Sequence, residues 1–204
     1  MPDIHFEFLV EERSMEGFLQ VWLPVFLPKC TFKVSPFQGK RALLKELGNR
    51  LAAYAKWLPE NYRLVVMVDR DGKDCRELKN RLEGICRKAG LTSKKSAQGG
   101  DWQVATVIAV EELEAWYFGD WEAVRQAYPK APEDVPRRAA YRDPDAIGGG
   151  TWEAFERVMQ KSGCLKGGLP KVDAARRIGV HMDPRRGNKS ASFNFFHRTL
   201  ADPV

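Results

Sequence analysis

Four short stretches of the chain are dominated by apolar residues and are rich in β-branched and aromatic side chains. Stretches of this length and composition are typical of buried β-strands. The third stretch, Leu-Val-Val-Met-Val, is apolar throughout, which favours a central parallel strand that is covered on both faces. The predicted strands span residues 4–10, 31–34, 64–68 and 102–110.

Longer stretches place apolar residues three and four positions apart, which is the spacing of one face of an α-helix. Ser14 is expected to cap the first helix, and Pro24 and Pro28 to kink or end it. A helix that begins at Glu112 is expected to break near Gly119. The polar residues 91–101 predict a loop. The other predicted helices span residues 40–57, 73–89, 152–160 and 172–178.

Strands that alternate with helices predict an α/β fold with a mostly parallel central sheet flanked by helices. We expect this α/β domain to span residues 1–130. Residues 131–150 contain three prolines and three consecutive glycines, which predicts an exposed loop. Residues 151–204 are expected to form a helical C-terminal extension that packs on the same domain, with Phe193 and Phe196 on its buried face.

The chain of 204 residues has a formal net charge of +6 and a sequence pI of about 9.2. A basic protein attracts polyanions, so nucleic acid is a candidate partner, although this charge is equally typical of a protein that is merely soluble. The four cysteines form no Cys-x-x-Cys pair, which predicts free thiols rather than a zinc site. No apolar run reaches the roughly 20 residues that span a bilayer and no signal-like segment is visible, so we expect a cytoplasmic protein with no membrane partner.

Acidic residues follow three of the predicted strands. Because the carboxyl ends of parallel strands meet at one edge of a sheet, these carboxylates are expected to lie near one another, where ligands gather. Asp69 and Asp71 are two positions apart, so both can face one cation in an extended segment. Magnesium prefers such oxygen ligands, but Asp-Arg-Asp-Gly is also the composition of a simple polar turn. The acids in question are Glu11, Glu12, Asp69, Asp71, Glu111, Glu112 and Glu114.

These segments resemble the topoisomerase-primase (TOPRIM) superfamily, in which one strand ends in Glu and another in Asp-x-Asp. Phe8-Leu9-Val10-Glu11 and Val66-Met67-Val68-Asp69-Arg70-Asp71 match that pattern. Glu-Leu-Glu-Ala-Trp at residues 112–116 further resembles the domain of unknown function 4276 family, which is related to the OLD (overcoming lysogenization defect) nucleases. The other matches to that family are Ser14, Glu16, Phe18, Asp120, Pro170-Lys171 and Ser192-Phe193.

One position departs from the family pattern. Glu12 stands where the family usually has Gly, and it is expected either to add an acidic ligand or to distort the turn beside the metal.

The resemblance implies magnesium-dependent (or manganese-dependent) cleavage of phosphodiester bonds in DNA or RNA, by an effector of bacterial anti-phage defence. It implies that Glu11, Asp69 and Asp71 hold a first ion. For a second ion the candidate ligands are Glu16, Glu112 and Glu114.

A positive side chain beside the attacked phosphate would stabilise charge and handle protons. Lys171 is our candidate and Lys189 the second, although a single lysine is more often a solvated surface residue. The chain has no Gly-Lys-Ser/Thr phosphate loop, so any ATPase would be a partner. The alternative function is a non-catalytic metal-binding subunit of an ATPase-containing complex.

Overall fold

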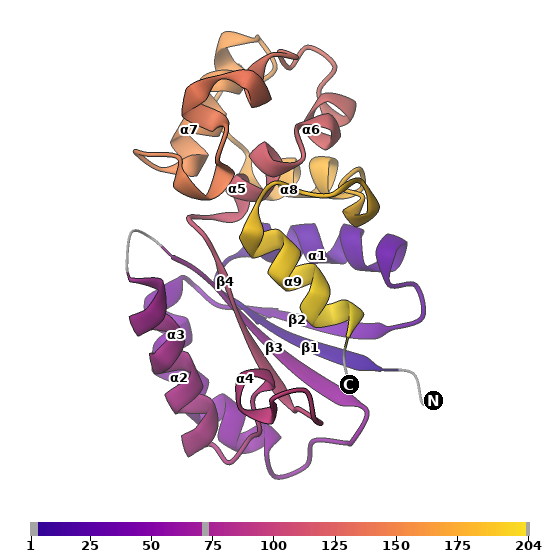
Figure 1. The fold of residues 1–204 in the computed structure, drawn as a ribbon, viewed down its shortest axis with the longest axis vertical. Coiled ribbons are helices and arrows are strands. Elements are labelled where there is room, and N and C mark those ends of the chain that lie inside the picture. Colours follow the sequence, from indigo (N-terminus) through magenta and orange to yellow (C-terminus); the bar gives the residue numbers. More distant parts are fainter. Residues whose placement is uncertain (1–3, 71–73, 203–204) are drawn as a thin grey trace.

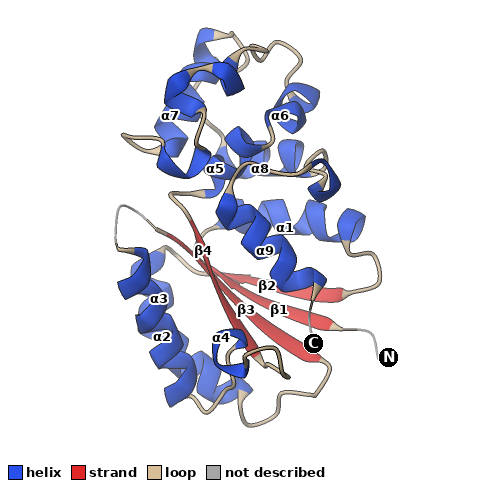
Figure 2. Ribbon diagram, viewed as in Figure 1, coloured by secondary structure: helices blue, strands red, loops and turns tan. Residues whose placement is uncertain are grey.

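A computed structural model describes residues 4–70 and 74–202. It confirms the predicted α/β fold, with a four-stranded sheet in the order β2-β1-β3-β4 whose neighbouring strands are all parallel (Figure 2). Each strand lies within about two residues of its predicted bounds. The strands are β1 (His5–Val10), β2 (Thr31–Pro36), β3 (Tyr62–Asp69) and β4 (Val104–Ala109).

Helices cover both faces of this sheet. Helices α2 (Lys40–Tyr54) and α3 (Cys75–Lys88) lie on one face, and α1 (Arg13–Phe26) and α9 (Ala191–Ala201) lie on the other (Figure 1). Successive side chains of a strand point to opposite faces. Accordingly, Val66 of β3 is buried with the α2–α3 layer, whereas its neighbours Val65 and Met67 are buried with α1 and α9. A central strand between two helical layers therefore needs an unbroken apolar sequence.

Four further helices lie together beyond the carboxyl end of β4 (Figure 1). They are α5 (Leu113–Gly119), α6 (Trp121–Ala127), α7 (Thr151–Lys161) and α8 (Lys171–Gly179). The break between α5 and α6 falls at Asp120, next to the predicted position.

The segment between α6 and α7 contains short 3₁₀ turns and is largely exposed. Its buried side chains include Val135 and Ile147, which anchor it on the main core. The domain boundary near residue 130 stays a prediction. The 3₁₀ turns of the chain are η1 (Val135–Arg137), η2 (Ala139–Tyr141), η3 (Pro144–Ala146) and η4 (Pro184–Arg186).

Helix α1 ends at Phe26, between the two prolines that were predicted to kink or end it. Two other local predictions were wrong. Ser14 does not cap α1, because the helix already begins at Arg13 and its N-cap residue is Glu12. The predicted loop at residues 91–101 contains a helical turn, α4 (Lys94–Ala97), which is stabilised by a capping box between Ser93 and Ser96.

The predicted burial of two phenylalanines is confirmed. Phe193 and Phe196 are buried on the inner face of α9. None of the helices in the described part of the chain has the length and apolar character that a bilayer-spanning segment needs. Cys75, Cys86 and Cys164 are free thiols.

Candidate functional site

Two acidic residues meet at the carboxyl ends of the adjacent strands β1 and β3. Glu11 directly follows β1, and Asp69 is the last residue of β3. The strands pair in parallel with Val10 beside Met67, so the two acids come to the same level of the sheet. The backbone N–H of Asp69 donates a hydrogen bond to the Glu11 carboxylate (3.1 Å), and Glu11 is buried. Asp71, the third acid of the motif, lies outside the described residues.

Lys171 is the positive centre of a surrounding group of carboxylates. It is the first residue of α8 and is partly buried. Burial lowers the pKa of Lys171, but the negative charges of Glu114, Glu12, Glu112 and Asp69 together raise this pKa above its usual value. The lysine therefore carries a full charge among the acids that follow β1, β3 and β4.

Glu114 is the most deeply buried of these acids, with 2% of its surface exposed. It lies in the first turn of α5. Burial raises the pKa of Glu114 to about 7; Lys171 opposes this shift, whereas the nearby negative charges of Glu112 and Glu12 add to it. Its carboxyl group consequently exchanges a proton near neutral pH.

Glu112 joins the beginnings of two helices. It is the N-cap residue of α5 and has an extended backbone. Its Oε2 atom accepts hydrogen bonds from the Thr151 hydroxyl (2.9 Å) and from the Trp152 N–H (3.0 Å), both in the first turn of α7. A carboxylate is favourable there because helix N-termini carry unpaired N–H groups and a positive dipole end. The contact also places the Trp152 ring, whose centroid is 5.0 Å from Nζ of Lys171.

Tyr117 is a buried polar residue beside the same group. It follows Glu114 by three positions in α5, so both side chains lie on one face of the helix. The Tyr117 hydroxyl is buried and has no hydrogen-bond partner among the residues that the structure describes. Burial raises the Tyr117 pKa well above its usual value, and the charges of Glu114 and Asp69 contribute to the shift.

Glu111 faces another partner. Its carboxylate forms an ion pair with the guanidinium of Arg70, the residue between the two aspartates of the motif. The Arg70 N–H also donates to the carbonyls of Ala109 (2.9 Å) and Glu111 (3.0 Å). These bonds fasten the end of β3 to the segment that leaves β4.

Comparison with known protein families identifies the chain. The family described as "Domain of unknown function (DUF4276)" matches residues 10–201. The chain belongs to this family. Among solved structures, this DUF4276 chain is similar to the C-terminal region of the OLD protein of Xanthomonas campestris pv. campestris, with 14% sequence identity and a TM-score of 0.47. The similarity covers 96% of this chain and 97% of the other. No curated protein matches it significantly.

The segments by which the sequence resembles the DUF4276 family contact one another. The indole N–H of Trp116 donates to the Ser192 hydroxyl (2.9 Å), and the Trp116 and Phe193 ring centroids are 5.3 Å apart. Asp120 forms an ion pair with Arg186 (3.1 Å). These matched positions therefore join α5 to the segment around α9 rather than surrounding the acids themselves.

Two predicted site residues of the DUF4276 chain make other contacts. The Glu16 carboxylate accepts a hydrogen bond from Gln20 of the next helical turn (3.3 Å). Lys189 has an exposed side chain, and its backbone N–H donates to the Gly119 carbonyl (3.0 Å). Within the described residues, neither side chain forms a hydrogen bond or ion pair with the acids around Lys171.

Glu12 does not distort the turn after β1. Its φ of −133° and ψ of 161° are extended values that any residue adopts, so Gly is not needed for this backbone. Its carboxylate is close enough to raise the pKa of Lys171.

Sequence reasoning missed Tyr117 and Trp152. The three-residue spacing of Tyr117 from Glu114 was a usable signal once α5 was predicted. Trp152 had no comparable signal, because it lies in α7 and meets Lys171 of α8 only in the folded chain.

The residues present fit a magnesium ion. Among residues 4–70 and 74–202, no group of three His, Cys, Asp or Glu side chains lies close enough to hold an ion by itself. Magnesium in enzymes usually needs only one or two carboxylates, with waters and substrate phosphate completing the shell. Glu11 and Asp69 supply such a pair, and the unpartnered Tyr117 hydroxyl nearby leaves a hydrogen bond for a hydrated ligand.

Proposed function

We propose that this protein is a magnesium-dependent nuclease that cleaves phosphodiester bonds in nucleic acid. The observation that supports this most directly is the hydrogen-bonded meeting of Glu11 and Asp69 at the ends of two adjacent parallel strands. The same two positions match the Glu and Asp-x-Asp motifs of the TOPRIM superfamily. The net charge of +6 favours a polyanionic substrate.

In this proposal Glu11 and Asp69 hold the ion together with Asp71. A magnesium ion held there would activate a water and would stabilise negative charge on the phosphate that is attacked. Glu114 and Glu112 belong to the wider acidic group, but one oxygen of Glu112 already bonds the start of α7. We therefore assign Glu112 the role of positioning Trp152 and Lys171.

Lys171 and Glu114 supply the remaining chemistry. A charged lysine among carboxylates can contact a phosphate oxygen and stabilise the charge that develops there. Glu114, with a pKa of about 7, can hold a proton or release it at neutral pH, as a general acid or base must.

The resemblance to OLD-type nucleases supports a setting in bacterial anti-phage defence. We propose that a partner ATPase controls the nuclease in that setting.

Calorimetric titration with Mg²⁺ and Mn²⁺ tests the site, and incubation with plasmid DNA, single-stranded DNA and RNA tests the reaction. The wild type should bind the ion and cleave a substrate, whereas Asp69→Asn should lose binding and lower cleavage about 100-fold or more. Asp101→Asn, which removes an exposed acid from a distant loop, is the matched control and should match the wild type. Equal ion binding by wild type and Asp69→Asn would contradict the proposed site.

Lys171→Ala separates ion binding from catalysis. This variant should still bind Mg²⁺ but lose cleavage, and Lys171→Arg should restore part of it by returning the charge. Unchanged cleavage by Lys171→Ala would remove the lysine from the mechanism. Ion binding by the wild type without cleavage of any substrate, even with its partner present, would favour the non-catalytic metal-binding subunit.

A further inference from the structure

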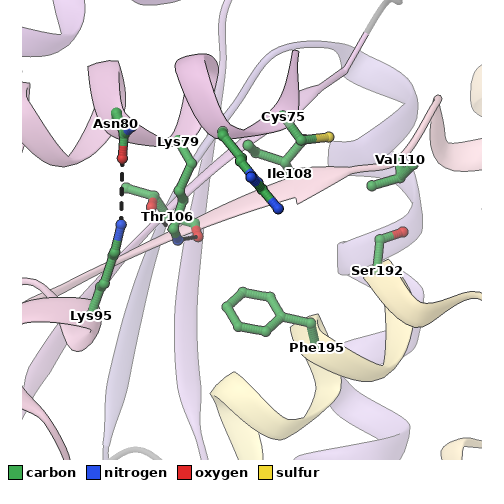
Figure 3. Close-up of a pocket in the computed structure, with 10 residues that line it drawn as sticks. Cys75, Lys79, Asn80, Lys95, Thr106, Ile108, Val110, Ser192 and Phe195 are labelled. Carbon is green, nitrogen blue, oxygen red and sulfur yellow. Dashed lines mark hydrogen bonds between the residues drawn. The ribbon is translucent and has the colours of Figure 1, made fainter. Parts of the chain in front are cut away.

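A cavity of about 470 Å³ lies along β4, an edge strand of the sheet (Figure 3). Helix α3 borders it from one face of the sheet and α9 from the other, so β4 forms its floor. Ile108 and Val110 supply apolar surface. Phe195 of α9 points toward the cavity from the side opposite Lys79 (Figure 3), and 43% of its surface is exposed although the neighbouring phenylalanines of α9 are buried.

The charge of the cavity wall has one sign. Among the described residues that line it, those with a formal charge are Arg76, Lys79 and Lys95. Arg76 and Lys95 are exposed, and Nζ of Lys79 lies 5.4 Å from the centroid of the Phe195 ring. Cations that surround an exposed aromatic ring suit a ligand that combines phosphate charges with flat bases.

The edge of β4 is already closed to an added peptide strand. The ammonium group of Lys79 donates to the backbone carbonyl of Thr106 and to its hydroxyl (2.6 Å), and lies 3.3 Å from the Glu83 carboxylate. A lysine that covers a strand edge is a common protection against edge-to-edge pairing. A peptide would have to displace this partly buried ammonium, whereas a phosphate backbone could pass over it to reach Arg76 and Lys95.

A neighbouring hollow extends the cavity between α3 and α4. A second hollow of about 600 Å³ shares Asn80 and Lys95 with it and extends to Arg87 at the end of α3. At its other end Val110 precedes Glu111, whose carboxylate pairs with Arg70 beside Asp69. Glu83 also lines the second hollow, but its carboxylate pairs with Lys79, so the exposed charged side chains of the two hollows are those of Arg76, Arg87 and Lys95. The other end of the cavity lies near the acidic edge of the sheet.

We infer that this β4-edge groove, formed by the two hollows, binds a single strand of nucleic acid. Arg76 and Lys95 contact its phosphates and Phe195 stacks on one of its bases. The inference rests on the proposed function in one respect: the groove would direct the bound strand toward Glu11 and Asp69, where it is cleaved.

Fluorescence anisotropy with labelled 20-nucleotide DNA and RNA single strands in EDTA tests binding without cleavage. Arg76→Gln/Lys95→Gln should weaken binding about tenfold or more at low salt and should reduce the slope of log K against log salt by about 1.4, since two phosphate contacts are lost. Lys161→Gln/Lys166→Gln removes two exposed charges in and after α7 and is the matched control, which should change neither quantity.

Phe195→Ala distinguishes stacking from charge. It should weaken binding about tenfold and leave the slope of log K against log salt unchanged. Phe195→Trp, which keeps an aromatic ring, should bind as tightly as the wild type. If Arg76→Gln/Lys95→Gln and the control Lys161→Gln/Lys166→Gln weaken binding equally, the inference is overturned, because binding would then depend only on net charge. A wild type that binds no single strand would overturn it too, as would a dimer in sedimentation that Phe195→Ala dissociates.

The two proposals fail separately. Asp69→Asn should leave binding in EDTA intact while it abolishes cleavage. If cleavage occurs but the groove variants bind and cut normally, the groove inference alone is wrong. If the groove variants lose binding but no ion-dependent cleavage is ever found, the nuclease proposal alone is wrong.

Discussion

Glu114 shows what the fold does to a single side chain. It is a carboxylate in the first turn of α5 that is almost completely removed from water. Its neighbours include one cation, Lys171, and two further carboxylates, Glu112 and Glu12. Burial destabilises the charged carboxylate more than Lys171 stabilises it. Between the pKa values of the unfolded and folded states, the folded protein therefore holds a proton on Glu114 that the unfolded chain releases.

This proton predicts a specific pH dependence of stability. The pKa of Glu114 is about 7 in the folded state, against an ordinary value near 4.5. Between these pH values the folded state binds more protons, so the contribution of Glu114 to stability is full below about pH 4.5 and falls as pH rises through 7. The loss is about 3 kcal/mol. Glu114→Gln should remove this loss and be more stable than the wild type above pH 7, as measured by urea unfolding in EDTA.

The control is Glu46→Gln, which changes an exposed glutamate of α2. Its unfolding free energy should follow the wild-type pH profile. A Glu114→Gln profile parallel to the wild type from pH 4.5 to 8 would show that the Glu114 pKa is not raised.

The α5–α6 junction shows how elements are held together. Asn188, which precedes α9, donates from Nδ2 to the Trp116 carbonyl (2.9 Å), and its Oδ1 accepts the Ser190 N–H (2.8 Å). This turn lies against Gly119, at the end of α5. A Cβ atom at Gly119 would lie 1.8 Å from Oδ1 of Asn188 and 2.9 Å from the backbone N of Ser190. Gly119 is therefore required by the close approach of two elements.

Gly119→Ala should lower the free energy of unfolding by about 1–3 kcal/mol, the usual cost of overpacking. Gly84→Ala is the matched control, since Gly84 lies inside α3 and a Cβ there would meet nothing within 4 Å. That substitution should raise the free energy of unfolding by about 0.5–1 kcal/mol through helix propensity. Both are measured by urea unfolding, and equal effects of the two would contradict the packing at Gly119.

The whole molecule is built around the sheet and a core that extends beyond it. One buried cluster joins Phe6 and Val65 of the strands with Phe155 of α7, Ile178 of α8 and Phe196 of α9. A second cluster, which includes Cys86, fills the other face under α2 and α3. Since β3 contributes to both clusters, we expect the α/β part and the C-terminal helices to unfold as one unit.

Phe196→Ala tests this unity from one face of the sheet to the other. This substitution should lower the free energy of unfolding by about 3–5 kcal/mol. The Cys86 thiol lies on the opposite face, and the free energy that protects it from pulsed thiol labelling should fall by the same amount. Phe195→Ala, at the exposed neighbouring position, should have a much smaller effect on both. Full protection of Cys86 in Phe196→Ala would instead show that the α/β part is stable without the C-terminal helix.

Local pattern was enough for most of the fold. The apolar runs and helical spacing predicted all four strands and the main helices, because burial on one or both faces imposes a period on the sequence. Placing Glu11 and Asp69 near one another needed only the rule that parallel strands end at the same edge. The error at Ser14 arose because a serine is a preferred cap residue, whereas α1 begins one residue before it, with Glu12 at the N-cap.

The sequence by itself thus determined the α/β class, the strand ends that bear the acids, and the burial of Phe193 and Phe196. Only the tertiary structure showed that Lys171, Trp152 and Tyr117 lie beside those acids. The physical reason is that these side chains come from helices distant along the chain. Their meeting depends on how α5, α7 and α8 pack, and helical periodicity reports which face of a helix is buried but not which neighbour buries it.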